Sequence, residues 1–438
     1  MASEEGVERV VEKQPISWNK QTSIDYMELT EDRSAGHALA APIVEATKVY
    51  RGHEDAVDSV RWLDQTSFIT GSHDHSLKVW DSTSGECVKT LKGSTEGIYN
   101  VDVSNDRKLF LTCSAGKSKN AAVWDAHKAT LLRHLDGHPS AVYHGAFAPT
   151  NTHTITGGKD GSVRVHDVNV SKPVVALQPH SDVVECCRFC MGDVREDGTA
   201  APSKGSGPSP STNLIATASR DGSIMVMDLG ADRGSGAFRI KEAHGGKYVY
   251  ALLMINPTTI ISAGGDYLIR KFDLRMLGPE GNRPSLVYVG HSSPVRSLTV
   301  SQDYTRFVST CADGSARLWK VDEKRVLFKR KHSIEDRVGL AQKLLAKEER
   351  KYAQGQEVDI EHLKKLRADL EDLQKRQSEL ESHLSSLTDV QKIGADMMFA
   401  GHKDLVSDCS LETVSDGKAL LLTSSWDQTV RLWNVPLE

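Results

Sequence analysis

His53, Thr70 and Asp74 supply the residue types of a nucleophilic triad: an imidazole base, a hydroxyl nucleophile and an orienting carboxylate. Trp80 follows Asp74 by six positions and adds an indole N–H donor. These four groups predict either catalysis or a buried polar network. How often the set occurs decides between the two, because an enzyme needs only one such site.

The same types recur along most of the chain. An Asp stands six positions before Trp80 or the residue that takes its place in another copy. These aspartates are Asp74, Asp160, Asp221, Asp266, Asp313 and Asp427. Four positions before each of them stands Thr70, Thr156, Thr217, Ser262, Ser309 or Thr423. Six copies indicate a structural network rather than six active sites. The sequence therefore predicts no enzyme, and it contains no phosphate-binding loop or paired metal-ligand motif, so we expect no cofactor and no metal.

Each copy lies in a repeat that starts at a His and ends about 28 residues later. The clearest unit runs from Gly52-His53 to Trp80-Asp81, and Gly93-Ser94 to Trp124-Asp125 is a degenerate copy. Within a unit, short β-prone runs such as VDSVRW and LKVWD are separated by Gly, Asp, Asn or Ser. Seven units can be counted, and a period of this length indicates a repeat architecture.

These motifs resemble the WD-repeat (beta-transducin-like) family, over residues 43–332 and 394–438. The resemblance implies an all-β fold, a seven-bladed propeller with four strands in each blade. It also implies that the repeated residues tie the strands of a blade together. The residues given this structural role are His53, Thr70, Asp74, Trp80, Asp160, Asp221, Asp266, His291, Asp313, Trp319, His402, Asp427 and Trp433.

Several units depart from the pattern. Ser94 and Ser118 stand at or near the His and Asp positions of unit two, while His166, Met227 and Phe272 replace Trp in units three to five. We expect incomplete networks in these blades. Cys186, Cys187 and Cys190 fall in an innermost strand without a second ligand pair, which favours buried thiols over a metal site.

Two segments do not follow the repeat. Residues 1–42 form a polar extension, and residues 333–393 change to a helical period. We predict an inserted α-helical coiled-coil hairpin there, linked near Gly355, followed by blade seven at 394–438. Its second helix would carry an apolar seam at Leu363, Leu366, Leu370, Leu373, Leu380, Leu384 and Leu387. The insertion would join blades six and seven on the face that carries the rim described below.

The chain ends soon after the third strand of unit seven, so we predict that Ile43–Tyr50 supplies the missing outer strand and closes the ring. The net charge is -5, 39% of the residues are hydrophobic, and no apolar run is long enough to span a bilayer. The N-terminus lacks a secretory signal, and the seven Cys show no disulfide spacing. We therefore expect a cytoplasmic, monomeric propeller that contacts neither membrane nor nucleic acid directly.

The family resemblance also implies which positions surround the top of the central channel. Carried over to this sequence, the rim residues are Asp58, Tyr99, Tyr143, Glu185, Tyr248, Tyr250, Arg296, His73, Lys159, Arg220 and Trp426. Tyr, Trp and Arg are enriched at binding hot spots. We expect partner proteins to bind here, and at Leu380, Leu384 and Leu387 at the base of the hairpin, which its shorter first helix would leave uncovered.

The leading functional prediction is a non-catalytic interaction scaffold, or a subunit of a larger assembly with several protein partners. A substrate receptor of a cullin-RING ubiquitin ligase is an alternative, because Phe272-Asp273-Leu274-Arg275 resembles the Trp-Asp-x-Arg motif of such receptors. An RNA-associated propeller is a third reading, based on the basic residues Arg325, Lys329, Arg330 and Lys331. A solvated outer strand is the simpler explanation of those charges, and we favour it.

Overall fold

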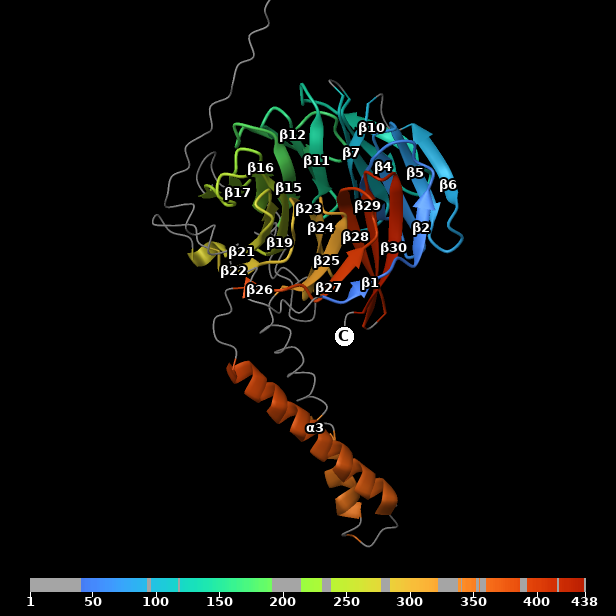
Figure 1. Cartoon of the computed structure of the whole chain (residues 1–438), viewed down its shortest axis with the longest axis vertical. Helices are drawn as coiled ribbons and strands as arrows, with labels where there is room; N and C mark the ends of the chain where they lie inside the picture. The colour runs from blue at the N-terminus through green and yellow to red at the C-terminus, as the bar shows by residue number, and fades with distance from the viewer. Residues whose placement is uncertain are drawn as a thin grey trace, which may run out of the picture. The chain divides into compact units, whose positions relative to one another are not determined.

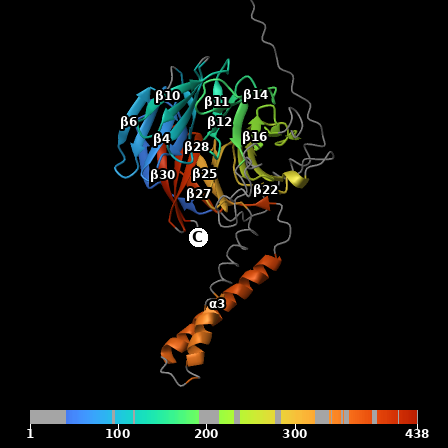
Figure 2. The same cartoon turned by 180° about the vertical axis from the view of Figure 1, so that it is seen from behind.

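Seven β-sheets arranged around a central channel make up the propeller in the computed structural model (Figures 1 and 2). The structure describes residues 41–438, except for 93–95, 117–118, 191–213, 231–237, 277–283, 322–337, 340, 352–353, 355–359, 387–391, 416 and 437–438. The innermost strand of each blade packs against that of the next, and β28 of blade seven returns to β3 of blade one. The predicted seven-bladed fold is therefore confirmed.

The first four blades each contain four antiparallel strands. Blade one consists of β3 (Val57–Trp62), β4 (Ser67–Ser72), β5 (Ser76–Asp81) and β6 (Cys87–Lys92); blade two of β7 (Ile98–Val103), β8 (Leu109–Ser114), β9 (Ala121–Asp125) and β10 (Thr130–Leu135). Blade three consists of β11 (Val142–Phe147), β12 (His153–Gly158), β13 (Val163–Asp167) and β14 (Val175–Leu177); blade four of β15 (Val184–Phe189), β16 (Leu214–Ser219), β17 (Ile224–Asp228) and β18 (Phe238–Ile240).

Blades five and six each carry a fifth strand, which runs parallel to the outer strand. Blade five consists of β19 (Val249–Asn256), β20 (Thr259–Gly264), β21 (Ile269–Asp273), β22 (Leu286–Tyr288) and β26 (Lys392–Ile393), with the 3-10 helix η2 (Leu274–Met276) after β21. Blade six consists of β23 (Val295–Val300), β24 (Arg306–Cys311), β25 (Ser315–Lys320), β27 (Met397–Ala400) and β1 (Ile43–Val44). Blade seven consists of β28 (Val406–Ser415), β29 (Lys418–Ser425), β30 (Thr429–Pro436) and β2 (Lys48–Arg51).

The hydrophobic core lies largely between neighbouring blades. One cluster joins Val57 and Phe68 of blade one to Leu422 and Val430 of blade seven, and another joins Ile69 of blade one to Phe110 and Trp124 of blade two. Alternating side chains of each strand point to opposite faces of the sheet, so each blade can pack against both of its neighbours.

Tight turns join the second and third strands of the blades. The residue after the repeated Asp has a positive φ in all six regular blades, at His75, Gly161, Gly222, Tyr267, Gly314 and Gln428. At Gly161 an added Cβ would also lie 2.6 Å from the carbonyl oxygen of His180. Glycine is favoured there because it adopts positive φ without steric cost and leaves room for the next blade.

The N-terminal side of the chain closes the ring, as predicted, although its strand is shorter than Ile43–Tyr50. β2 pairs antiparallel with β30, with Tyr50 opposite Val430. Tyr50 is buried, and its hydroxyl donates a hydrogen bond to the carbonyl oxygen of Ser82 at 3.1 Å. Ile43 and Val44 belong instead to blade six, where β1 runs parallel to β27. The N-terminal segment therefore links blades six, seven and one.

The helical insertion leaves the propeller at a place that the sequence analysis did not predict. It lies inside blade six, between β25 and the outer strand β27, rather than between blades six and seven. Residues 394–438 are thus a sequence repeat but not one blade. The turn that contains Asp313 lies at the rim end of blade six, since rim residues such as His73 and Trp426 directly precede the repeated Asp of their own blades. β25 begins after this turn and runs away from it, so its other end, where the insertion follows, lies opposite to the rim. The stretch 325–331 lies outside the described residues.

Two helical segments occur among the described residues of the insertion. Residues 341–351 are helical, and α3 spans Ile360–Ser386. An ion pair between Arg367 and Glu349, with 2.7 Å between nitrogen and oxygen, connects the two segments. The insertion ends at β26, which pairs with Val287 and Tyr288 of blade five.

Candidate functional site at the channel mouth

The triad-like residues of blade one form a closed hydrogen-bond network. His53 Nδ1 lies 2.7 Å from Asp74 Oδ2, and His53 Nε2 lies 2.7 Å from Thr70 Oγ1. The indole N–H of Trp80 donates to the same Thr70 oxygen at 2.9 Å. Burial by itself would raise the pKa of Asp74, but hydrogen bonds from His53 and Ser76 hold it well below its ordinary value. We call this set of contacts the blade network.

The other blades vary this network. Blade seven repeats it fully, with His402 bonded to Thr423 and Asp427 and Trp433 donating to Thr423. Blades three to five keep the contacts of His138, His180 and His244 with a hydroxyl and an Asp. They lack the indole donor. In its place His166 donates to the carbonyl oxygen of Asp136, while Met227 and Phe272 are buried.

Blade two keeps one network contact among its described residues: Trp124 donates to Thr112 at 3.0 Å. Ser94 and Ser118 lie outside the described residues. Asn120 connects neighbouring backbone segments here, since its side-chain amide donates to the carbonyl oxygens of Gly116 and His138.

These networks cannot act as the predicted alternative, a nucleophilic site. Thr70, Thr156, Thr217, Ser262, Ser309 and Thr423 are all fully buried, so no substrate can reach their hydroxyls. Their oxygens are already engaged by His, and in three blades by Trp. Buried polar groups that are satisfied in this way specify one arrangement of the strands.

Blade six departs from the others at its carboxylate. His291 Nε2 lies 2.6 Å from Ser309 Oγ, but His291 Nδ1 lies 3.9 Å from Asp313. Cys311 joins these two in a cluster whose potential metal-ligand atoms lie within 4.8 Å of one another. Arg317 already places a cationic nitrogen 3.8 Å from Asp313, and burial raises the pKa of the Cys311 thiol to about 12. A neutral thiol beside a guanidinium is a poor cation site.

Most of the rim residues predicted from the family resemblance surround one cavity of about 290 Å³ at the end of the channel. Nine of them line it: Asp58, His73, Tyr99, Tyr143, Glu185, Arg220, Tyr250, Arg296 and Trp426. Lys159 and Tyr248 are exposed and do not line the cavity. We call these nine residues the channel mouth.

Half of the channel mouth is an aromatic arc built around Asp58. The carboxylate of Asp58 accepts a hydrogen bond from the Trp426 indole at 2.7 Å and lies 2.6 Å from His73 Nε2. That contact with Asp58 raises the pKa of His73 above its usual value. His73 meets Tyr99 edge to face, and Tyr99 stacks on Tyr143 with ring centroids 4.8 Å apart. The arc thus crosses blades seven, one, two and three.

The other half of the channel mouth combines arginine with tyrosine. Arg220 forms an ion pair with Glu185, and its guanidinium lies 5.2 Å from the centre of the Tyr143 ring. Arg296 lies 4.3 Å from the centre of the Tyr250 ring. At these distances a guanidinium is attracted to the face of an aromatic ring. Blades four, five and six therefore present cations held flat against aromatic surfaces.

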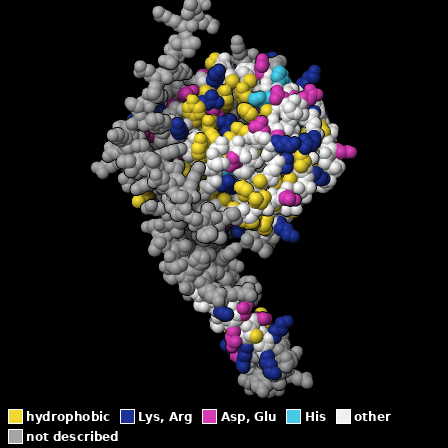
Figure 3. Space-filling model, viewed as in Figure 1, with side chains coloured by type: hydrophobic (Ala, Val, Ile, Leu, Met, Phe, Trp, Pro, Cys, Tyr) yellow, Lys and Arg dark blue, Asp and Glu magenta, His cyan; other side chains and the backbone are white. Residues whose placement is uncertain are grey.

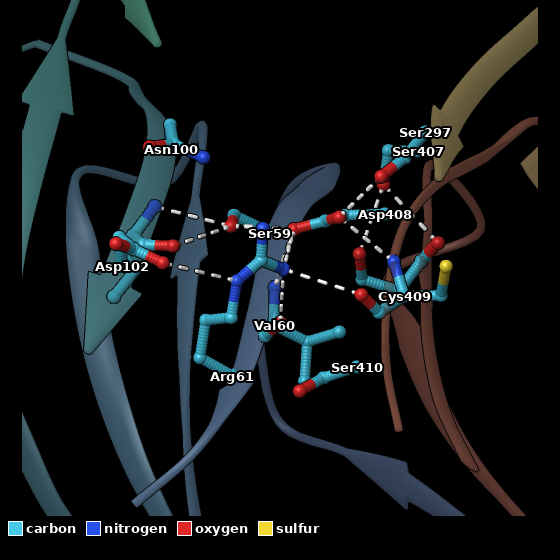
Figure 4. A network of polar contacts seen from close by, with 12 residues as sticks. Ser59, Val60, Arg61, Asn100, Asp102, Ser297, Ser407, Asp408, Cys409 and Ser410 are labelled. Carbon is cyan, nitrogen blue, oxygen red and sulfur yellow. Dashed lines mark hydrogen bonds and ion pairs between the residues drawn. The ribbon is translucent and has the colours of Figure 1, made fainter. Parts of the chain in front are cut away.

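Below the mouth, an ionic network crosses the channel wall between blades (Figure 4). Arg61 Nη1 lies 2.5 Å from Asp408 Oδ2, and Arg61 Nε lies 3.6 Å from Asp102. Ser59 and Ser297 each donate to Asp408 at 2.7 Å. The network joins blades one, two, six and seven. Sequence reasoning missed it, because the only signal was an isolated charge in each of several β-prone runs.

The other features singled out in the sequence are the cysteines, the FDLR tetrapeptide, the basic stretch and the leucines at the base of the insertion. Cys186, Cys187 and Cys190 are buried, none of the seven cysteines forms a disulfide, and burial raises the pKa of Cys187. In the FDLR tetrapeptide, Phe272 is buried and Arg275 pairs with Asp273 at 2.7 Å. The basic residues Arg325, Lys329, Arg330 and Lys331 lie outside the described residues, as do the side chains of Leu380, Leu384 and Leu387.

Acidic and basic side chains are interspersed with apolar ones on the face shown in Figure 3. They are not gathered there into one broad basic patch of the kind that binds a phosphate backbone. Among the helices that the structure describes, none has the length and apolar character needed to cross a bilayer.

Comparison with known proteins agrees with this architecture. The WD40 profile (WD domain, G-beta repeat) matches residues 45–81, 85–125, 129–167, 282–320 and 396–434. The chain therefore contains WD40 repeats, and its seven blades around one channel have the architecture of a WD-repeat propeller. Proteins built on this fold generally serve as platforms for protein interaction.

Individual relatives share only part of their length with this chain. A nuclear distribution protein nudF of Emericella nidulans is 26% identical over 287 residues, which are 54% of this chain and 63% of the relative. A nuclear distribution protein PAC1 of Arthroderma otae is 29% identical over 34% of each chain. A ribosome biogenesis protein WDR12 homolog of Drosophila sechellia is 32% identical over 31% of this chain and 32% of its own. The chain therefore spans less than two thirds of each.

Replacing Asp74 by Ala should remove the carboxylate on which the first blade network depends. His53 and the backbone N–H of Glu54 would lose their partner, at a cost of about 1–3 kcal/mol in the free energy of unfolding. Urea denaturation measures the loss. Glu86→Ala, an exposed acid of the same blade, is the matched control and should change stability by less than about 0.5 kcal/mol. Equal stability of the two variants would contradict the structural role.

The buried histidines should make stability depend on pH. Burial and the charge of Arg164 lower the pKa of His138 to about 4, and burial also lowers the pKa values of His180, His244, His291 and His402. Between about pH 6.5 and 4 the unfolded chain binds more protons than the folded one, so stability is full above that window and falls with pH inside it.

His138 alone should remove about 1 kcal/mol between pH 7.5 and 5.5, measurable as a lower urea midpoint. His73, whose pKa is raised, acts in the opposite direction, but it is one residue against eight, because the pKa values of His134, His144 and His166 are lowered as well. A midpoint that stays constant or rises on acidification would show that these rings are not held neutral.

Proposed function

We propose that this protein is a non-catalytic interaction scaffold, a subunit of a larger assembly that holds several protein partners. The channel mouth is the first docking element and the helical insertion is the second. The propeller acts as a monomer in the cytoplasm and contacts neither membrane nor nucleic acid directly. The relatives are named for nuclear distribution and for ribosome biogenesis, so they do not choose between assemblies.

The observation that carries this proposal is the composition of the channel mouth. Seven blades contribute Trp, Tyr, His and Arg side chains to one depression, and each is braced by a neighbouring side chain. Aromatic residues and arginine dominate binding hot spots. Tyr and Trp bury large areas at little cost in side-chain entropy, and arginine offers several hydrogen-bond donors in a fixed planar arrangement. Trp426 is 42% exposed even though its N–H is bonded, so its apolar face is open to a partner.

For the insertion we propose an antiparallel coiled-coil hairpin. Along α3 the described seam leucines are Leu366, Leu370 and Leu373, and Gln377 takes the place of a leucine at the next step of the series. These four residues are less exposed than the described positions between them. Leu373 is buried. The Arg367–Glu349 ion pair joins α3 to the first helical segment near the linking turn, as an antiparallel arrangement requires. Leu380, Leu384 and Leu387 extend the seam toward the base and are the proposed contacts for a second chain.

Combined replacement of Trp426 and Tyr250 by Ala should abolish capture of at least one partner from cell extract. The two side chains lie in different halves of the mouth and contribute surface rather than core packing, so the melting temperature should change little. Leu131→Ala with Leu132→Ala, on the outer strand of blade two, is the matched control. Affinity purification with quantitative mass spectrometry compares the three proteins. Full retention of every partner by the mouth variant refutes the role of this surface.

Replacing residues 333–391 by a short Gly-Ser linker should leave a folded, monomeric propeller that no longer enters its native assembly. The replaced range stops before β26, so blade five retains its fifth strand. Thermal unfolding and light scattering test the first expectation, and sedimentation of cell extracts tests the second. Normal incorporation of the shortened protein would show that the insertion is not a docking element.

A further inference from the structure

The two acids of the channel mouth are satisfied within the protein. Asp58 is held by Trp426 on one carboxylate oxygen and by His73 on the other. Glu185 is paired with Arg220. A cationic group entering the cavity would have to break one of these contacts before it found a carboxylate, at the cost of leaving a buried polar group without its partner.

One cation of the mouth has no such partner. Arg296 lies on Tyr250, and no carboxylate of the described residues forms an ion pair with it. Its side chain is half-buried and lines the cavity. Arg296 also forms a side-chain hydrogen bond with Tyr250. A guanidinium carries five N–H donors, so others along its edge can still meet the oxygens of a carboxylate or phosphate.

The cavity walls deeper in the channel add no competing negative charge. Asp408 is occupied by Arg61, Ser59 and Ser297. Arg188 also lines the cavity, and its Nε donates to the carbonyl oxygen of Leu252. Beneath the mouth, therefore, the acid is neutralised while a second guanidinium faces the same space.

We propose that the channel mouth receives an acidic side chain of a partner segment, a carboxylate or a phosphate, at Arg296 beside Tyr250. This inference rests on the proposed function and names the chemistry that the site selects. Residues next to the acid lie against the Tyr99–Tyr143 stack, which offers an uncharged aromatic surface across the cavity. A cavity of about 290 Å³ holds one such side chain and excludes a folded domain.

Immobilised peptide sets test the proposal directly. Each set has a degenerate background and one fixed central residue: Asp, Glu, phosphoserine, Ser or Lys. The purified full-length protein should bind the acidic sets about tenfold better than the Ser set, as a charge-assisted hydrogen bond provides, and should bind the Lys set least. Comparing the binding of the phosphoserine set with that of the Asp and Glu sets identifies which acid is preferred. Raising the salt concentration should weaken the preference.

Arg296→Gln should erase the difference between the acidic and Ser sets, whereas Arg296→Lys should retain part of it. Lys403→Gln is the matched control: it removes one positive charge from an exposed residue next to His402, outside the cavity lining, and should leave the preference intact. Equal melting temperatures exclude misfolding as the cause.

The outcomes separate this inference from the function on which it rests. If the peptides bind and the Trp426/Tyr250 variant loses them, but acidic and neutral sets bind equally, the acid site is wrong and the docking surface stands. If the preference survives Arg296→Gln, the acid binds elsewhere and the assignment is overturned. If no set binds the normal protein, the docking function of the mouth fails together with the inference.

Discussion

Everything in this propeller depends on the pairing of β2 with β30. Four residues from the N-terminal side, Lys48–Arg51, complete the last blade and join the two ends of the folded chain. Without them β30 would present an unpaired edge, and the contacts that Tyr50 makes with blade one would be lost. Closure also sets the diameter of the channel, because the innermost strands can form a ring only when the last one meets the first. The cavity at the channel mouth is a consequence of that closure.

In blades one, three, four, five and seven, contacts of His with Ser/Thr and Asp fix the strands of one sheet relative to the preceding loop, which closure of the ring does not do. The network tolerates the replacement of its fourth member, the tryptophan. Where Trp is absent, Phe272 and Met227 fill the space with apolar surface, and His166 finds a carbonyl acceptor instead. A buried donor must be satisfied or absent, and either solution keeps the blade intact. This tolerance explains how unequal repeats form seven equivalent blades.

The channel adds a second kind of bracing, across blades rather than within them. Arg61 reaches Asp408 of blade seven and Asp102 of blade two, and Ser297 of blade six joins the same carboxylate (Figure 4). Buried ion pairs add little net stability, but a fully bonded one specifies which blades adjoin. Above it, the same positions on successive inner strands supply Tyr99, Tyr143 and Tyr250. The next position on these strands also lines the cavity, as Asn100 does after Tyr99, and the strand pairing shifts register there, between Ile98 and Asn100.

The sequence, through its resemblance to WD-repeat proteins, determined the propeller, its seven blades and nine of the residues that line the mouth. Once that resemblance is recognised, each of these residues is located by a fixed offset from Asp74 or its equivalents, or by a step along one strand. Tertiary structure decided what depends on contacts distant in the chain. The helical insertion interrupts blade six because β27 returns to pair with β25 across some 75 intervening residues, and no local pattern records that choice. The split of Ile43–Tyr50 between two blades has the same origin. Arg61 and Asp408 lie almost 350 residues apart in sequence, so only closure of the ring brings their charges together.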